Sequence, residues 1–182
     1  MCFSEEVSWL TLIIGTVINI ACIIYLSSLP NHNKIIPILL VLSWQYGLLM
    51  QIPDALAWRN PSSKTPGKLA FILNVTQPLV WLMIFCIIFY IYNLPITRLI
   101  PAIILFMIYI VDVIRNIPKI NFKLKYDNCR NLQYTWWKKI SGVLYIITMC
   151  AIILAYPSIP LISISLILFL GSFLMSTILV KK

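Results

Sequence analysis

Charged residues are scarce in this sequence. Aspartate and glutamate together number 5 in 182 residues, and charged residues make up 10% of the chain against 61% hydrophobic residues. An average soluble domain has about 25% charged residues. A soluble core could not hide so much apolar surface, so the composition indicates a membrane protein.

The residues that carry most catalytic chemistry are also missing. His32 is the only histidine, so multi-histidine metal sites have no ligand set. No lysine lies inside a long apolar run, which excludes a retinal Schiff base. The Gly-x-Ser-x-Gly motif and phosphate-binding glycine loops are absent as well. The sequence therefore predicts no catalytic residue and no metal site, and it assigns no cofactor.

Cysteine gives no disulfide framework, because the chain has 5 cysteines and three of them, at positions 22, 86 and 150, sit inside apolar runs. Cys2 and Cys129 are read as free thiols, with acylation as a further reading for Cys2. The N-terminus has Glu5 and Glu6 where a secretory signal would be positively charged. The first apolar run is therefore predicted to stay as a membrane span.

Long apolar runs dominate what remains. A helix that crosses a bilayer needs about 20 apolar residues, and turn or charged residues separate six runs of about this length. We predict an all-α integral membrane protein, one domain over residues 1–182 in contact with the lipid bilayer. Its six transmembrane helices are predicted at 7–26, 35–58, 69–92, 97–114, 140–156 and 158–180.

The basic residues segregate when these runs are threaded through a membrane. One side receives only Lys34 and Arg98, and the other receives Arg59, Lys64, Lys68, Arg115, Lys119, Lys123, Lys125, Arg130, Lys138, Lys139, Lys181 and Lys182. Lysine and arginine accumulate on the cytoplasmic side, so both termini are predicted to be cytoplasmic. The net charge of +9 follows from this topology, and we predict no nucleic-acid partner.

The segment 119–137 has a period of two instead of a helical period. Apolar and polar residues alternate on both sides of Asp127-Asn128-Cys129-Arg130, a sequence typical of a turn. We predict a cytoplasmic β-hairpin whose lysines meet anionic lipid headgroups. A solvated loop that only follows the charge rule is the alternative reading.

Polar residues inside the first three spans share helical stripes. In the second span the stripe contains Trp44, Gly47, Gln51, Asp54 and Trp58, which recur at steps of three and four. The first span has Ser8, Thr11, Gly15, Asn19 and Cys22 in the same pattern, and the third has Ala70, Asn74, Gln77 and Trp81. These stripes predict a polar pocket that opens to the cytoplasm. Its candidate ligand-binding residues are Asn19, Gln51, Asp54, Asn74 and Gln77.

Two functions fit such a polar layer. An acid inside a membrane is a functional candidate by default, so the first is binding or translocation of a small solute or ion, as in a transporter. The alternative is a non-catalytic membrane scaffold or assembly factor, in which the amides only join helices. Pro53 and Pro78 place two helix breaks beside the layer. Asp112 is predicted to form an ion pair with Arg115. Either function is compatible with a homo-oligomer.

Three short motifs resemble a family of uncharacterised small polytopic membrane proteins found in bacteria and large DNA viruses. They are the opening Met1-Cys2-Phe3-Ser4, the segment 50–60, and Gln77-Pro78, with an echo at 132–136. The resemblance implies a multi-span fold and supplies no activity. The family pattern has glutamate at the position of Asp54, which keeps a carboxylate but changes its reach. The abundance of isoleucine, lysine and asparagine suits an AT-rich genome, viral or otherwise.

Overall fold

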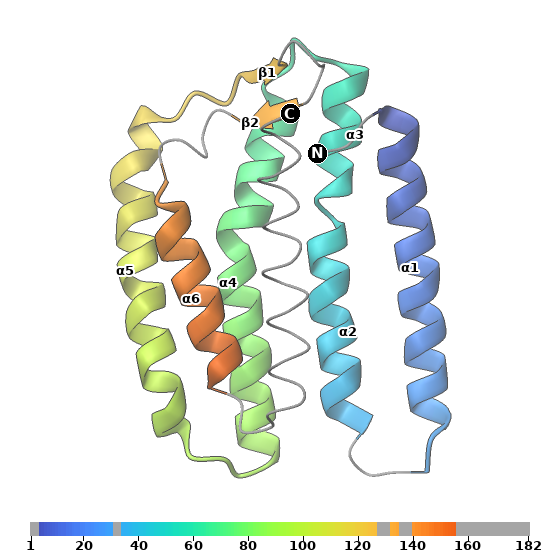
Figure 1. Cartoon of the computed structure of the whole chain (residues 1–182), viewed down its shortest axis with the longest axis vertical. Coiled ribbons are helices and arrows are strands. Elements are labelled where there is room, and N and C mark those ends of the chain that lie inside the picture. Colours follow the sequence, from blue (N-terminus) through green and yellow to red (C-terminus); the bar gives the residue numbers. More distant parts are fainter. Residues whose placement is uncertain (1–3, 31–33, 127–131, 135–139, 156–182) are drawn as a thin grey trace.

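The protein is a row of helical segments in which each segment of membrane length runs opposite to the one before it (Figure 1). The computed structural model describes residues 4–30, 34–126, 132–134 and 140–155. In chain order the elements are α1 Glu5–Ser28, α2 Ile35–Leu48, α3 Gln51–Arg59, α4 Thr65–Ile91, η2 Ile96–Leu99, α5 Ile100–Asn116, η3 Ile117–Lys119, β1 Leu124–Tyr126, β2 Leu132–Tyr134 and α6 Gly142–Leu154.

Four helical segments are long and apolar enough to cross a membrane. They are Glu5–Ser28, Ile35–Arg59, Thr65–Ile91 and Ile96–Lys119, and each comes within a few residues of a predicted span. The fifth predicted span, 140–156, contains α6, which is a shorter apolar helix of 13 residues. The sixth, 158–180, lies outside the described residues. The chain is therefore a largely helical protein with spans of membrane length.

Serine caps explain where two helices begin. The Ser4 hydroxyl accepts the Val7 N–H at 3.2 Å, so α1 starts before the apolar run with two glutamates in its first turn. The Ser141 hydroxyl accepts the Leu144 N–H at 3.2 Å at the start of α6. A side-chain acceptor at this position satisfies one of the backbone donors that the first helical turn leaves unpaired.

The second span, Ile35–Arg59, contains a short turn, in agreement with the helix break predicted at Pro53. It is interrupted at Leu49 and Met50, where α2 ends and α3 begins. The cause is Pro53, which has no N–H to donate to the Leu49 carbonyl and whose ring clashes with that carbonyl in a regular helix. The Ile52 N–H reaches the Leu49 carbonyl at 3.1 Å instead, in a tighter turn.

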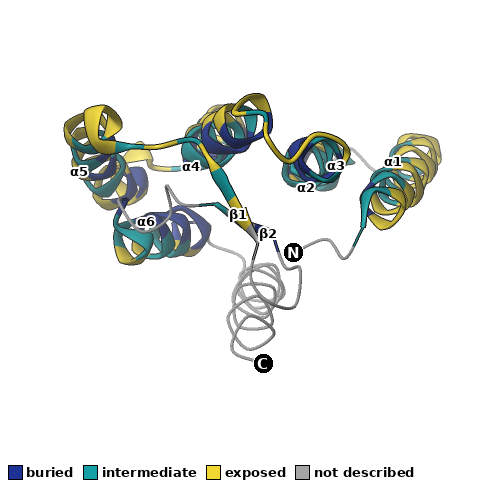
Figure 2. Cartoon of the chain, turned by 90° about the horizontal axis from the view of Figure 1, so that it is seen from above, coloured by how far each residue is buried: buried dark blue, intermediate teal, exposed yellow. Residues whose placement is uncertain are grey.

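The helices form a curved row with α1 at one end (Figures 1 and 2). Helix α1 packs on α2 and α3, these pack on α4, and α4 contacts both α5 and α6. The largest part of the buried core lies between α4, α5 and α6, where Phe89, Tyr109 and Met149 are almost fully enclosed. The row is thus thick around α4 and a single helix deep at α1.

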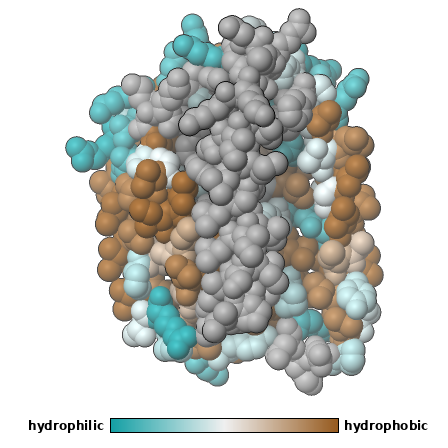
Figure 3. Space-filling view, viewed as in Figure 1, coloured by the Kyte–Doolittle hydropathy of each residue, from teal (hydrophilic) through white to brown (hydrophobic). Residues whose placement is uncertain are grey.

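The outer surface of the row is apolar at mid-height. Ile13 and Val17 on α1 and Ile104 and Met107 on α5 are more than half exposed, and hydrophobic residues gather between two hydrophilic ends in Figure 3. In water such a surface would favour aggregation, whereas in a bilayer it meets hydrocarbon tails. The exposure pattern is what a helix row in a membrane requires.

A short extended segment, which contains Phe122 and the strands β1 and β2, crosses the end of the row where α4 begins. Strands β1 and β2 pair antiparallel, with Leu124 opposite Tyr134 and Tyr126 opposite Leu132. Residues 127–131, which join these two strands, lie outside the described residues, as does 135–139. Just before β1, the Phe122 ring packs edge-on against Phe71 of α4 with centroids 5.4 Å apart. The segment therefore rests on α4.

Candidate functional site

Asp54 is the most enclosed acid of the described residues. It lies in the first turn of α3, with 4% of its surface exposed, and the Tyr134 hydroxyl of β2 donates a hydrogen bond to its Oδ1. These two residues are 80 positions apart in the chain. The bond thus joins the second span to the extended segment, which is predicted to lie on the cytoplasmic side. Pro53 sets the position of this carboxyl group, because it forces the helix to restart just before it.

Gln77 lies at a junction of three helices. Its side-chain Oε1 accepts a hydrogen bond from the Tyr145 hydroxyl of α6 at 2.7 Å. Its Nε2 faces α2, where a Cβ atom built on Gly47 would lie 3.8 Å away. The absence of a side chain at Gly47 leaves room for the amide. Helix α4 continues through Pro78, so the break predicted beside Gln77 does not occur.

Asn74 and Gln51 lie on either side of the boundary between α3 and α4. The Asn74 Nδ2 donates to the Ala70 carbonyl of its own helix at 3.0 Å and approaches the Met50 sulfur at 2.9 Å. Gln51 is the first residue of α3 and is half-buried. Two residues further along α4, the Thr76 hydroxyl is hydrogen-bonded to the Tyr46 hydroxyl of α2. These contacts hold the second span against α4 near the turn at Leu49 and Met50.

Asn19 belongs to a separate cluster. Its Nδ2 donates to Gln45 Oε1 at 2.8 Å, and the Gln45 amide donates to the Thr16 hydroxyl at 3.0 Å. At 1.5 Å per residue, Asn19 lies about 21 Å below the start of α1, whereas Asp54 lies about 8 Å below the end of α3. The structure therefore joins Asn19 to α2 near the middle of the row and does not bring it into a layer with Asp54.

Asp112 does not pair with Arg115, which corrects the predicted ion pair. Its Oδ1 accepts a hydrogen bond from the Asn116 Nδ2 at 3.1 Å, and its Oδ2 accepts one from the Ser141 N–H at 3.0 Å. The backbone donor at Ser141 starts α6, so Asp112 fixes the position of α6 against α5. Arg115 is exposed, and a solvated arginine gains little from a surface pair.

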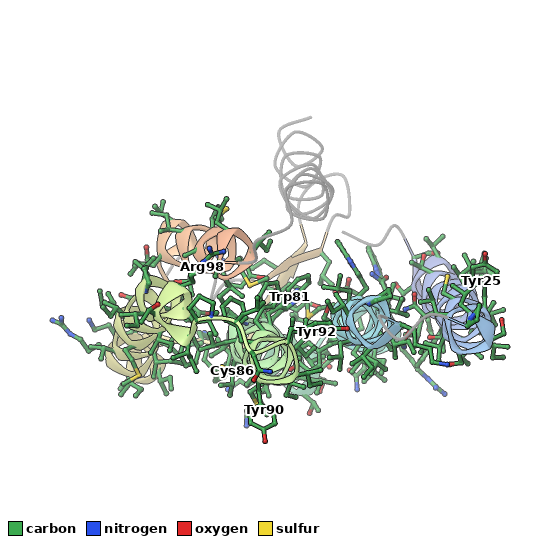
Figure 4. The ribbon with its side chains drawn as sticks, turned by 90° about the horizontal axis from the view of Figure 1, so that it is seen from below. Tyr25, Trp81, Cys86, Tyr90, Tyr92 and Arg98 are labelled. Atoms are coloured by element: carbon green, nitrogen blue, oxygen red, sulfur yellow. The ribbon has the colours of Figure 1, made fainter. Side chains whose placement is uncertain are left out.

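Two buried polar atoms have no hydrogen-bond partner in the described part of the chain. They are Trp81 Nε1 on α4 and Thr148 Oγ1 on α6. Trp81 comes one turn after Gln77, and Thr148 one turn after Tyr145. Trp81 also packs edge-on against Trp44 at a centroid distance of 6.2 Å, and it leaves α4 on the side opposite Tyr90 (Figure 4). An unpaired buried donor carries a free-energy cost of about 1–3 kcal/mol.

A cavity of about 300 Å³ lies at the other end of α4. It is lined by Phe89, Tyr90, Asn93, Leu94 and Ile96, and none of these is a predicted site residue. Asn93 adopts a left-handed backbone conformation with φ of 50°, which turns the chain sharply between α4 and η2. The cavity follows from this turn. Tyr90, 85% exposed, suits an aromatic residue at a membrane interface.

The described residues form no metal-binding cluster and no disulfide. They contain no cluster of three or more histidine, cysteine or acidic side chains that could hold a metal ion. Cys22, Cys86 and Cys150 are free thiols on three different helices. Cys2 and Cys129 lie outside the described residues. The polar side chains between the helices are therefore amides, hydroxyls and carboxyls, which can hydrogen-bond or carry charge.

Sequence reasoning missed the hydroxyl partners of the candidate residues. Tyr134, Tyr145 and Tyr46 each bond a polar residue on another element. One signal was available for Tyr145, whose hydroxyl is one of the few polar groups in the apolar run 140–156. A second was available for Tyr134, which alternates with polar residues in the extended segment.

Four helices that are long and apolar enough to cross a membrane indicate a helical integral membrane protein. Comparison with protein-family models, with curated proteins and with solved structures finds no match. The resemblance of the N-terminal half to small polytopic membrane proteins therefore stays a prediction.

Proposed function

We propose that this protein is a non-catalytic membrane scaffold or assembly factor, in which polar side chains hold the helices and the extended segment in one arrangement. The observation that carries the proposal is the burial of Asp54 together with its bond from Tyr134. A carboxyl group that binds a solute from the cytoplasm needs an approach from water. This one is 4% exposed and holds a protein hydroxyl instead.

The other candidate residues support the same proposal. Asn19 bonds Gln45 across α1 and α2, and Gln77 accepts from Tyr145 across α4 and α6. Interhelical bonds of this kind contribute about 0.6–2 kcal/mol each in membranes. Side chains that already bond a neighbouring helix serve as contacts between helices.

A second function, binding or translocation of a small solute or ion, is favoured by a different observation. Trp81 Nε1 and Thr148 Oγ1 are buried without a partner in the described part of the chain, next to the Gln77–Tyr145 bond. A small polar molecule with an acceptor for the indole N–H would remove this cost. In this reading Gln51, Asp54, Asn74 and Gln77 form the cytoplasmic approach, and Asn19 lies deeper.

Thermal stability in the presence of solutes separates the two functions. We expect that sodium, potassium, ammonium and zwitterionic amino acids leave the Tm of the full-length purified protein unchanged. Asp54→Asn should lower the Tm to the same extent with and without each solute. Asp112→Asn serves as the matched control, because it removes an acid at another helix boundary. A solute that raises the Tm of the wild-type protein and of Asp112→Asn, but not of Asp54→Asn, would contradict the scaffold proposal and support solute binding.

We propose that the full topology has six spans with both termini in the cytoplasm and a hairpin between the fourth and fifth spans. The alternation of direction between α1, the span formed by α2 and α3, α4, α5 and α6 supports it (Figure 1). So does the position of Lys34 and Arg98 at one end of the row and Arg59, Lys68 and Lys125 at the other, because lysine and arginine are cytoplasmic in most membrane proteins.

Tags on the two ends of the chain test this topology. In sealed right-side-out vesicles, a protease or a membrane-impermeant reagent should reach neither an N-terminal nor a C-terminal tag until the membrane is opened. A tag inserted beside Lys34 should be reached in intact vesicles. Opposite accessibility of the two ends would require an odd number of spans and overturn the six-span topology.

A further inference from the structure

The cavity at the end of α4 lies at the junction of two spans. The helical segment Thr65–Ile91 ends there and Ile96–Lys119 begins there, and residues of both segments and of the turn between them line the cavity of about 300 Å³. Tyrosine is enriched at the level where the hydrocarbon of a bilayer meets the polar headgroups, and Tyr90 is 85% exposed. The cavity is therefore at a level that membrane lipids reach.

The lining of this cavity combines apolar side chains with two hydrogen-bonding groups. The apolar residues are Phe89, Leu94 and Ile96. The other two, Tyr90 and Asn93, bring a hydroxyl and a carboxamide, and neither side chain has a hydrogen-bond partner among the described residues. The described residues that line the cavity carry no charge. Such a lining suits an uncharged group that offers acceptors beside an apolar chain.

An exposed apolar stripe on α4 leads away from the cavity. Met83 and Ile87 are 56% and 45% exposed. With Tyr90 they recur at steps of four and three, which places them on one side of the helix. Tyr90 projects from α4 away from the neighbouring helices (Figure 4). At 1.5 Å per residue the stripe runs about 10 Å into the span, so an acyl chain that leaves the cavity would lie along it.

We propose that this cavity binds the ester-linked glycerol region of a membrane phospholipid. The Asn93 amide and the Tyr90 hydroxyl donate hydrogen bonds to the ester carbonyls, and the first part of an acyl chain meets the apolar lining. Ester carbonyls accept hydrogen bonds and carry no charge, which matches the two donors and the uncharged lining. The inference goes beyond the scaffold function, because it assigns a ligand that is recognised by its linkage and not by its headgroup.

Two lipids that differ only in their linkage test the site on the full-length protein. Phosphatidylcholine with ester-linked chains has two carbonyl acceptors, whereas ether-linked phosphatidylcholine of the same chain length has none. Native mass spectrometry of the protein in detergent, with each lipid added in turn, measures the two dissociation constants. Each hydrogen bond should make the ester lipid bind about fivefold more tightly, so we expect a preference of about 25-fold when both form.

Single variants identify the two donors. Tyr90→Phe removes the hydroxyl and keeps the ring. Asn93→Gly removes the amide at a backbone conformation, φ 50°, that glycine adopts freely. Each variant should bind the ester lipid about fivefold more weakly and the ether lipid as tightly as the wild type. Tyr25→Phe is the matched control and should change neither affinity, because Tyr25 is a 65% exposed tyrosine on α1 that does not line the cavity.

Several results would overturn the proposal. One is equal affinity of the wild-type protein for the ester and ether lipids. Another is an equal loss of both lipids in the Tyr90 and Asn93 variants, which would indicate a change of shape and not the loss of hydrogen bonds. Tighter binding of phosphatidylglycerol than of phosphatidylcholine would place recognition at the headgroup. A second protein chain bound in place of lipid, and lost in Tyr90→Phe, would make this face an interface between copies of the chain.

Discussion

Asp54→Ala is expected to lower the free energy of unfolding by about 2–4 kcal/mol, since it removes a buried hydrogen bond to a carboxyl group and leaves a cavity. Asp54 is 4% exposed, and the Tyr134 hydroxyl loses its acceptor in the variant. The extended segment should then detach from α3. Unfolding by denaturing detergent in mixed micelles, followed by tryptophan fluorescence, measures the loss.

Glu6→Ala is the matched control for Asp54→Ala. Glu6 is an exposed acid in the first turn of α1, and its interaction with the helix dipole is worth about 0.3–1 kcal/mol. The control should therefore change the stability by less than the Asp54 variant. An Asp54→Ala protein as stable as the wild type would show that the carboxyl group has no part in holding the segment.

Gly67→Ala is expected to be the second most damaging single substitution, with a loss of about 1–3 kcal/mol or more from overpacking. The new Cβ would lie 2.2 Å from the Phe122 carbonyl oxygen and 3.2 Å from its carbonyl carbon. Backbone atoms cannot rotate away as a side chain does, so the segment before β1 has to move. The Phe71–Phe122 contact would be lost with it.

Gly142→Ala is the control for this substitution. Apart from its chain neighbours, no atom of the described residues lies within 4 Å of a Cβ atom built on Gly142, which is the first residue of α6. Alanine costs about 0.5–1 kcal/mol less than glycine in a helix, so the control should be neutral or slightly stabilising. Equal stability of the Gly67 and Gly142 variants would mean that the extended segment does not cross α4 at this distance.

The long helices could be predicted from the sequence because hydrophobic length is a local property. Runs of apolar residues bounded by charge place α1, α4 and α5 within a few residues. The interruption at Leu49 and Met50 was within reach of the sequence too, because Pro53 cannot donate to the Leu49 carbonyl. Pro53 therefore predicted a helix break here, whereas hydropathy, which does not register backbone hydrogen bonds, gave only the bounds of the span.

The partners of the polar residues could not be predicted in the same way. Gln77 bonds a residue 68 positions away and Asp54 one 80 positions away. Stripes on single helices show which side chains face protein. They do not show the helix or strand that meets them, because the order and rotation of packed helices are set by the whole core. For the same reason Asn19 was grouped with Asp54, although it bonds Gln45 in the middle of the row.

The central claim is that Asp54 and Tyr134 form a structural bond between the second span and the extended segment. A double-mutant cycle with Asp54→Asn and Tyr134→Phe, with unfolding measured in mixed micelles, tests it most directly. Because the two residues are in contact, we expect a coupling energy of about 1 kcal/mol or more, with Tyr90→Phe as a control that does not couple to Asp54. Additivity of the Asp54 and Tyr134 substitutions within about 0.3–0.5 kcal/mol would contradict the claim.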